Sequence, residues 1–320
     1  MDELLNTPAI THGLRKVENR MRRLAGSSAL PGINAGADRI ITAGGKRLRP
    51  ALTLATCLAL GKTPDRRVIT AAACVELIHA GSLVHDDLMD GAAQRRGART
   101  LNAELGEGKA LVIGDFMLAR AGLAAITSVS RPVAEVLAAT VVELAEGQFM
   151  ETADQFDPGR TVESALRSIT GKTAALFRAA CLVAAICAHA SDEEKARMAL
   201  YGERFGLIFQ ILDDLLDLTA PAERLGKPSG NDLRQGVYTF PMLRAMAKDP
   251  SVLRDDVAAT LAALRETTIV GDTLEYCRGL AADAVSALPV IHDSEMAAIM
   301  YGLPTAYIDH AERQTLTRAS

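Results

Sequence analysis

The chain has 320 residues, of which 49% are hydrophobic and 23% are charged, and its net charge at pH 7 is −4. These values are typical of a globular protein with a large apolar core, and they exclude a chain that is mostly disordered. The mild net acidity gives no overall attraction to nucleic acid, so no nucleic-acid partner is expected. We expect one domain spanning residues 1–320, because no long linker or low-complexity tract interrupts the chain.

Helical periodicity, broken by short turns, covers almost the whole chain. Aromatic residues make up only 4% and Trp is absent, a composition that favours helices over sheets. No run of alternating apolar and polar residues indicates a strand. The predicted fold class is therefore all-α. The expected helices lie at roughly 9–24, 34–43, 49–60, 66–85, 101–106, 109–127, 132–151, 161–168, 172–189, 192–218, 239–247, 252–265, 271–287 and 294–308.

Cysteine usage and the chain start indicate a cytoplasmic protein. The start, Met1-Asp2-Glu3, lacks the basic residues of a signal peptide. The most apolar stretch, 179–190, is too short to cross a membrane, so no transmembrane segment is expected. Five cysteines form no CxxC pair and lie mostly in apolar runs, which indicates buried thiols in a reducing compartment. They are Cys57, Cys74, Cys181, Cys187 and Cys277.

Two acidic clusters with the same Asp-Asp-x-x-Asp spacing, at 86–90 and 213–217, each follow an apolar helical run. On a helix the first and last aspartates of each cluster share a face. With 21 aspartates in the chain, roughly 0.09 such matches are expected by chance. A solvated charged face is the alternative, but it fits the apolar flanks poorly. Oxygen-only ligands suit Mg²⁺, so the candidate metal ligands are Asp86, Asp87, Asp90, Asp213, Asp214 and Asp217.

Each acidic cluster is followed by a polar loop that carries basic residues. Arg95-Arg96-Gly97 follows the first cluster and Lys227-Pro228 follows the second. Cations next to metal-binding carboxylates would complete a site for a polyanion such as a diphosphate. An ordinary charged surface loop explains either segment alone, but the repetition of the arrangement favours the polyanion site.

From about Gly13 to Tyr307 the chain resembles the polyprenyl synthetases, the trans-isoprenyl diphosphate synthases. The ordered set of motifs carries this resemblance, since each motif alone would be weak. The motifs are Gly44-Gly45-Lys46-Arg47-Leu48-Arg49-Pro50, Glu76-Leu77-Ile78-His79, the first acidic cluster, Arg95-Arg96-Gly97, Gly114-Asp115-Phe116, Glu146-Gly147-Gln148, Lys172-Thr173, Gln210, the second acidic cluster, Gly226-Lys227-Pro228 and Asp232-Leu233-Arg234. The resemblance implies the isoprenoid synthase fold, a bundle of long helices around a central cavity.

The resemblance also implies two substrates, an allylic diphosphate and isopentenyl diphosphate. Asp86, Asp90 and Asp213 would hold Mg²⁺, three ions per site, and the other three aspartates would complete the shells. Contacts to the allylic diphosphate would come from Arg95, Lys172, Gln210 and Lys227, with Thr173 beside the developing cation. Contacts to isopentenyl diphosphate would come from Gly45, Lys46, Arg49, His79 and Arg96.

Several of these basic residues have simpler explanations. Lys46 and Arg49 would otherwise be a solvated helix start, and His79 a satisfied core histidine. Val237 is a departure from the family pattern, because many relatives carry a lysine there in a Gly-Lys-x-Thr sequence. One cationic contact to the allylic diphosphate is then absent, and Lys227 remains.

Product length in this family depends on what blocks the apolar tunnel beneath the first acidic cluster. Gly81 stands five residues before Asp86, where farnesyl-type enzymes carry an aromatic residue, so the tail is expected to pass toward Ile78. This predicts a hexaprenyl to decaprenyl product. Geranylgeranyl diphosphate is the alternative, with Ile78 or a residue on a neighbouring helix, Phe116 or Met117, ending the tunnel.

Two other functions remain as alternatives. A non-catalytic subunit of a heteromeric synthase typically loses aspartates that this chain keeps. A terpene cyclase on the same fold would lack Lys46, Arg49 and His79. The family resemblance further implies a homodimer, for which the Ala-rich segment 109–145 is the expected interface, and a peripheral membrane contact for product release.

Overall fold

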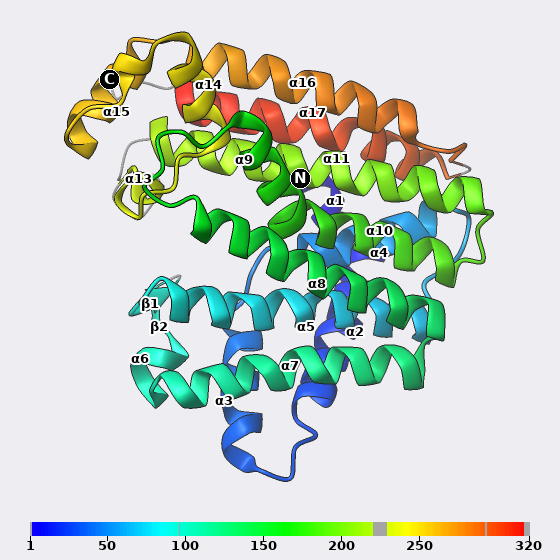
Figure 1. The fold of residues 1–320 in the computed structure, drawn as a ribbon. Coiled ribbons are helices and arrows are strands. Elements are labelled where there is room, and N and C mark those ends of the chain that lie inside the picture. Colours follow the sequence, from blue (N-terminus) through cyan, green and yellow to red (C-terminus); the bar gives the residue numbers. More distant parts are fainter. Residues whose placement is uncertain (1, 96, 220–228, 292, 317–320) are drawn as a thin grey trace.

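The structure, a computed structural model, describes residues 2–95, 97–219, 229–291 and 293–316, and almost all of its regular elements are helices (Figure 1). The first half contains α1 (Asp2–Asn6), α2 (Pro8–Ala25), α3 (Pro31–Thr42), α4 (Leu48–Ala59), α5 (Arg66–Met89), β1 (Gln94–Arg95), β2 (Ala98–Arg99), α6 (Leu101–Leu105), α7 (Glu107–Ser128) and α8 (Arg131–Ala153). The second half contains α9 (Val162–Ile169), the π-helical turn η1 (Thr170–Ala174), α10 (Ala175–Cys187), α11 (Asp192–Thr219), α13 (Asn231–Arg234), α14 (Phe240–Lys248), the 3₁₀ turn η2 (Pro250–Val252), α15 (Val257–Arg265), α16 (Ile269–Ala287) and α17 (Ser294–Leu316).

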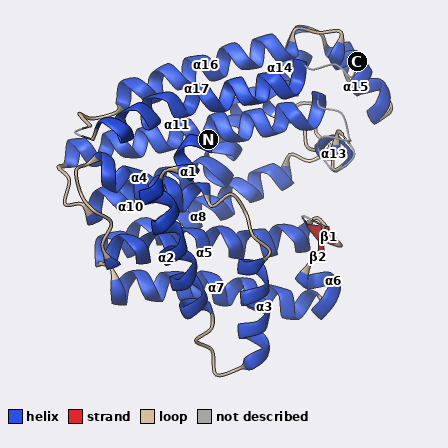
Figure 2. Cartoon of the chain, turned by 180° about the vertical axis from the view of Figure 1, so that it is seen from behind, coloured by secondary structure: helices blue, strands red, loops and turns tan. Residues whose placement is uncertain are grey.

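The long helices stack across the molecule (Figure 1). Helix α5 packs along α7, and α11 packs between α10 and α16. The core runs through the bundle, and its largest fully buried side chains include Tyr201, Phe177 and Phe205. Hairpin β1–β2, which follows the first acidic cluster, and α13, which follows the second, lie at the same end of the bundle (Figures 1 and 2).

The all-α prediction is confirmed, although α1, α13 and the π-helical turn η1 were not expected and several bounds differ. The described residues contain one two-stranded hairpin, with Gln94 paired to Arg99, which no strand pattern had indicated because each strand has only two residues. Helix α5 continues through the first acidic cluster to Met89. The helix expected at 252–265 begins later, at Val257, because Asp256 caps it by accepting a hydrogen bond from Ala259 N. Helix α17 extends to Leu316, beyond the expected end at 308.

Helix α5 begins where its sequence predicts because Asp65 is an effective N-cap. Its Oδ1 accepts hydrogen bonds from the backbone N–H groups of Arg67 (2.8 Å) and Val68 (3.0 Å). These bonds satisfy two of the N–H groups that a helix start leaves unpaired. The cap fixes the register of α5 and therefore the face on which the first acidic cluster lies.

Helix α8 crosses the segment around η1 at very short range because Gly147 has no side chain. A Cβ atom at Gly147 would lie 2.8 Å from the backbone oxygen of Ser168, a distance that no real Cβ contact tolerates. Ser168 also donates a hydrogen bond from Oγ to the Gly147 oxygen (3.0 Å). The π-helical turn η1, which carries Lys172 and Thr173, is thereby held against α8, and such turns often occur at functional sites.

Three described helical segments are long and apolar enough to cross a membrane, judged by length and composition: Arg66–Met89, Glu107–Ser128 and Val162–Cys187. Most of the apolar window is buried inside the bundle in the first and third segments, whereas only 39% of the window in Glu107–Ser128 is buried. Helix α7 therefore presents an exposed apolar face.

Candidate active site

A cleft of about 650 Å³ lies where the loop before α4, helix α5, hairpin β1–β2, α11 and α17 meet. Its lining combines residues that the sequence analysis assigned to two different substrates. These residues are Gly45, Lys46, Arg49, His79, Asp87, Arg95 and Asp213. Basic residues in and after the loop before α4 thus line the same cleft as carboxylates from both acidic clusters.

The first acidic cluster occupies the last turn of α5 and its C-cap. Burial raises the pKa of the Asp86 and Asp90 carboxyl groups, although the positive charges of Lys172 and Arg95 oppose the rise. Asp87 differs, since it is only 4% exposed and its Oδ1 accepts a hydrogen bond from Arg95 Nε at 2.6 Å. Hairpin β1–β2 is therefore tied to the cluster through Arg95.

The second acidic cluster divides its aspartates among three environments. Asp213 is exposed and lines the cleft. Asp214 is buried. Its burial is the main reason that the pKa of its carboxyl lies well above the usual value, and the negative charge of Asp232 raises that pKa further. Asp217 faces the segment after the cluster, where its Oδ2 accepts a hydrogen bond from Asp232 N (3.2 Å) and its backbone oxygen accepts one from Gly230 N (2.8 Å).

A short hydrogen-bond chain joins η1 to the second cluster. Thr173 donates from Oγ1 to Gln210 Oε1 (2.8 Å), and Gln210 donates from Nε2 to Asp214 Oδ1 (2.7 Å). The structure thus brings together three residues that the sequence analysis named separately.

Glu151, at the end of α8, interacts electrostatically with aspartates of both acidic clusters. It was not predicted from the sequence. It forms an ion pair with the Nζ of Lys172, and its charge acts on Asp86, Asp90 and Asp214. Burial lowers the pKa of the Lys172 ammonium, but Glu151 and the nearby aspartates outweigh that effect and raise it. The spacing in the sequence could have indicated Glu151, because it follows Gly147 of the Glu146-Gly147-Gln148 motif by one helical turn and therefore lies on the same face of α8.

The loop before α4 takes an unusual backbone path that aims its basic residues. Gly44 (φ 79°) and Gly45 (φ 155°) adopt conformations that other residues rarely take, and Arg47 is left-handed at φ 49°. The buried Arg47 guanidinium pairs with Glu76 Oε1 (3.0 Å) on α5 and with Glu18 Oε1 (3.2 Å) on α2. It also donates to the backbone oxygen of Ile41. Arg47 was not assigned a role from the sequence, yet it fixes this loop.

Arg49 is held as a cation in a poorly solvated place. Its guanidinium lies 4.3 Å from the centre of the Phe177 ring, a cation–π arrangement. Burial lowers its pKa to about 10, and the charge of Glu76 partly offsets this. Its Nε has no hydrogen-bond partner among the described residues. A desolvated guanidinium with unused donors is well suited to bind a diphosphate.

Two aromatic residues that were not predicted also line the cleft. Phe209 and Tyr307 stack with ring centres 5.4 Å apart and an interplanar angle of 20°. They form an apolar wall beside Asp213, and their rings place quadrupoles that favour positive charge near the carboxylates.

The donor set fits Mg²⁺. Carboxylates with raised pKa values, such as Asp86 and Asp90, are stabilised as anions when a divalent cation lies between them. No three acidic, histidine or cysteine side chains among the described residues already surround one point. Ions bound here would therefore take further ligands from water and substrate phosphate, as Mg²⁺ commonly does.

Other predicted residues lie in different settings. Gly81 is buried against α7, and Ile78 is 1% exposed in the core. Val237 is also buried, and its N–H closes a turn on Asp232 O (2.8 Å). Arg96 and Lys227 lie outside the described residues.

Comparison with known proteins is consistent with this geometry. A family model described as polyprenyl synthetase matches residues 31–268. The chain is 35% identical to octaprenyl diphosphate synthase of Escherichia coli (strain K12) over 82% of this chain and 85% of the relative. It is 33% identical to heptaprenyl diphosphate synthase component 2 of Geobacillus stearothermophilus over 94% and 88%. The crystal structure of a decaprenyl diphosphate synthase from Rhodobacter capsulatus superimposes with a TM-score of 0.88, at 30% identity over 97% of this chain and 99% of that one.

Proposed function

Because the chain belongs to the polyprenyl synthetase family, we propose that it condenses an allylic diphosphate head to tail with isopentenyl diphosphate to give a polyprenyl diphosphate. One observation carries this assignment: Lys46, Arg49 and His79 share a cleft with carboxylates of both acidic clusters. A site with cations on one side and metal-binding carboxylates on the other can hold two diphosphates at once. A terpene cyclase would need only one diphosphate.

The acidic side of the cleft would bind the allylic diphosphate. The family uses Mg²⁺, and three ions held by Asp86, Asp90 and Asp213 would supply charge neutralisation for the departing diphosphate. Arg95 and Lys172 would donate hydrogen bonds to the leaving oxygens as their negative charge develops. Asp214 and Gln210 would orient Thr173 toward the allylic carbon as its positive charge develops.

The basic side would bind isopentenyl diphosphate through Lys46, Arg49 and His79. When the allylic C–O bond breaks, its electron pair leaves with the diphosphate, and the double bond of isopentenyl diphosphate supplies the pair for the new C–C bond. A proton is then lost to the released diphosphate. The desolvated Arg49 strengthens binding because few waters compete for its donors.

We propose a product between hexaprenyl and decaprenyl diphosphate, with geranylgeranyl diphosphate as the alternative. The names of the relatives support the longer range. The test is incubation with Mg²⁺, labelled isopentenyl diphosphate and farnesyl diphosphate, followed by chromatography of the dephosphorylated product. A cyclic hydrocarbon, or no incorporation of labelled isopentenyl units into a chain longer than the farnesyl primer, would contradict the assignment.

We further propose that residues 1–320 form one domain and act in the cytoplasm as a homodimer. Exposed apolar side chains on α7 and α8 support the predicted interface at 109–145: Leu111, Val112, Leu123, Ile126 and Val142. A second candidate is a subunit of a two-component synthase, which the name of the Geobacillus relative, component 2, suggests. Activity that appears only when a second protein is added would favour that candidate.

A further inference from the structure

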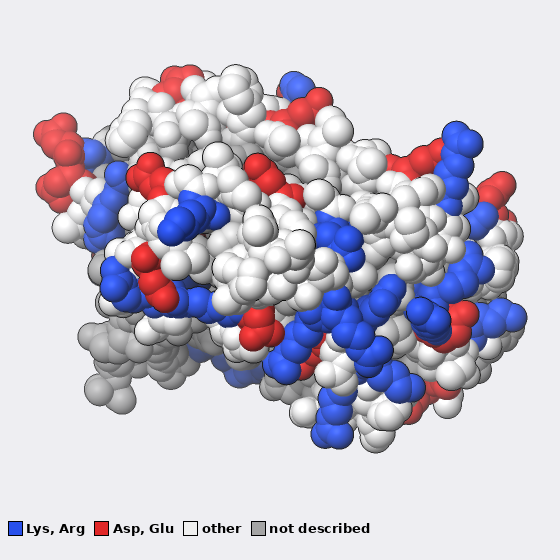
Figure 3. All heavy atoms as spheres, turned by 90° about the horizontal axis from the view of Figure 1, so that it is seen from below, with Lys and Arg blue, Asp and Glu red and all other residues white. Residues whose placement is uncertain are grey.

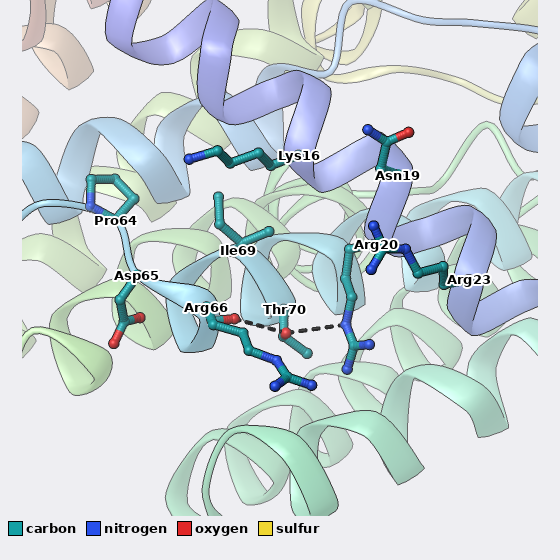
Figure 4. A pocket seen from close by; sticks show the side chains of 9 residues that line it. All are labelled: Lys16, Asn19, Arg20, Arg23, Pro64, Asp65, Arg66, Ile69 and Thr70. Carbon is teal, nitrogen blue, oxygen red and sulfur yellow. Dashed lines mark hydrogen bonds between the residues drawn. The ribbon is translucent and has the colours of Figure 1, made fainter.

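A second cavity, of about 640 Å³, lies between α2 and the start of α5, apart from the cleft (Figure 4). Four basic side chains line it: Lys16, Arg20, Arg23 and Arg66. None of the four forms an ion pair with a described residue; Arg20 only donates from Nε to Thr70 Oγ1 (3.2 Å). None of these residues has a role in the proposed catalysis. We name this cavity the basic pocket.

The basic pocket is open, and its charge is almost entirely positive. Lys16, Arg23 and Arg66 are exposed, and Lys16 extends over Ile69 (Figure 4). The positive charge contrasts with the net charge of −4 of the whole chain. The end of α2 that carries Arg23 projects from the bundle (Figure 1), and Lys and Arg side chains gather on the face seen from that side (Figure 3).

Asp65 is the only acidic residue among the described residues that line the basic pocket, and its position disfavours a small phosphate as the occupant. Asp65 already occupies the N–H groups of Arg67 and Val68 at the start of α5. Those N–H groups are the usual donors of a discrete phosphate site at a helix N-terminus. A carboxylate in their place repels a free phosphate. Long exposed cationic side chains instead suit a spread negative charge, such as an anionic lipid surface.

The position of the basic pocket also favours a membrane as its occupant, if the protein has the proposed function. The apolar tail of the product would run from Asp86 back along α5, and Ile69 in the pocket lies 17 residues earlier on the same helix. At 1.5 Å per residue this is about 25 Å. A long polyprenyl chain is insoluble in water, so an enzyme that releases it benefits from lipid near that end of α5.

We propose that the basic pocket docks the protein on an anionic membrane surface, with Lys16, Arg23 and Arg66 contacting lipid phosphates. This inference rests on the proposed function for its biological purpose, but its physical test does not. Each cation near an anionic surface contributes attraction that falls with rising ionic strength.

The test is sedimentation of the full chain with vesicles of phosphatidylcholine alone or mixed with phosphatidylglycerol. The wild type is expected to bind only the anionic vesicles, and to be released by salt. The triple variant Lys16→Gln/Arg23→Gln/Arg66→Gln is expected to lose on the order of 100-fold in partition coefficient. The matched control Arg167→Gln/Arg254→Gln/Arg265→Gln removes the same charge from exposed positions elsewhere and is expected to keep most of the binding. Thermal melts verify that both variants are folded.

Three results would overturn the docking proposal: no binding to anionic vesicles, equal binding to neutral vesicles, or an equal loss in both triple variants. Calorimetry with inorganic diphosphate tests whether the basic pocket binds a free phosphate in solution instead of lipid phosphates. A diphosphate site that the pocket variant loses, without vesicle binding, would make the basic pocket a soluble-anion site. Turnover in detergent, measured on the same samples, tests the proposed function separately, since a catalytic failure leaves the vesicle result unaffected.

Discussion

A Cβ atom at Gly81 would lie 3.2 Å from Cγ of Leu118 on α7 and 3.1 Å from the backbone oxygen of Gly114. Gly81 therefore allows α5 and α7 to pack closely, and Leu118 covers the place that a larger side chain at 81 would fill. If the product tail passes Gly81, Leu118 is the side chain it meets first.

Leu118 is accordingly predicted to limit product length. Leu118→Ala should shift the product distribution to longer chains, and Leu118→Phe to shorter ones, because the side chain volume next to Gly81 changes in opposite directions. Gly81→Phe should also shorten the product, but its ring must displace α7. Chromatography of dephosphorylated products measures these shifts. An unchanged distribution in both Leu118 variants would show that the tail takes another path.

The same contact predicts a stability effect. Gly81→Ala should lower the unfolding free energy by up to about 2 kcal/mol. The added methyl overpacks the α5–α7 crossing at a cost of about 1–3 kcal/mol, since the backbone oxygen of Gly114 cannot move aside as a side chain could. This cost exceeds the roughly 1 kcal/mol that Ala gains over Gly inside a helix. Adding Leu118→Ala should recover part of this loss, since one of the two close neighbours is removed. Denaturant unfolding of the two single variants and the double variant measures the coupling, and simple additivity would contradict the predicted contact.

Glu151 is predicted to position Lys172. Glu151→Gln should lower kcat about 10- to 100-fold, as loss of a residue that orients active-site ligands commonly does. The KM for isopentenyl diphosphate should change little, because that substrate binds on the other side of the cleft. The Mg²⁺ concentration needed for half-maximal activity should shift as well. Glu135→Gln, on the exposed face of α8, is the matched control, and an equal loss there would refute a specific role.

Arg47 is predicted to be a major source of stability. Arg47→Met removes one buried ion-pair partner of the Glu76 carboxylate, which is 4% exposed, and breaking such a pair costs about 3–5 kcal/mol. Calorimetry should therefore show a large fall in Tm. The double variant Arg47→Met/Glu76→Met should recover part of the loss, because the buried carboxylate is removed together with Arg47. Recovery should be incomplete, because Arg49 then loses the nearby charge of Glu76. Arg131→Met, which breaks the exposed pair with Glu135, should leave Tm unchanged.

Because the cysteine thiols are buried, we expect the protein to lose stability at alkaline pH. All five cysteines are buried and free, as the sequence indicated. Burial raises the pKa of the Cys57, Cys74 and Cys181 thiols from 9.0 to about 12. Between these values the unfolded chain has lost protons that the folded chain still holds, so unfolding free energy falls as pH rises. Their contribution is complete below about pH 9 and is lost toward about pH 12.

Denaturant unfolding at a series of pH values measures this slope, and thiol alkylation provides an independent control. The native protein should react far more slowly than the unfolded chain at pH 8. A single cysteine that reacts at the unfolded rate would contradict the burial on which the prediction depends.

The sequence predicted most of the helices and the spacing of both acidic clusters. These features depend on neighbours within about one or two turns, so local periodicity contains them. Prediction failed where a single hydrogen bond decides a boundary, as at the Asp256 cap, and where two-residue strands pair in the hairpin after Asp90. The sequence alone also could not divide the second cluster into the exposed Asp213 and the buried Asp214.

By itself, the sequence determined that this protein is helical and that its helices carry two clusters of closely spaced carboxylates and a separate set of cations. Only the tertiary structure decided that Glu151 meets Lys172, that Arg47 joins Glu18 to Glu76, and that Gly81 faces Leu118. The physical reason is range. A residue's own helix sets its face, but packing between segments far apart in the chain decides what that face meets.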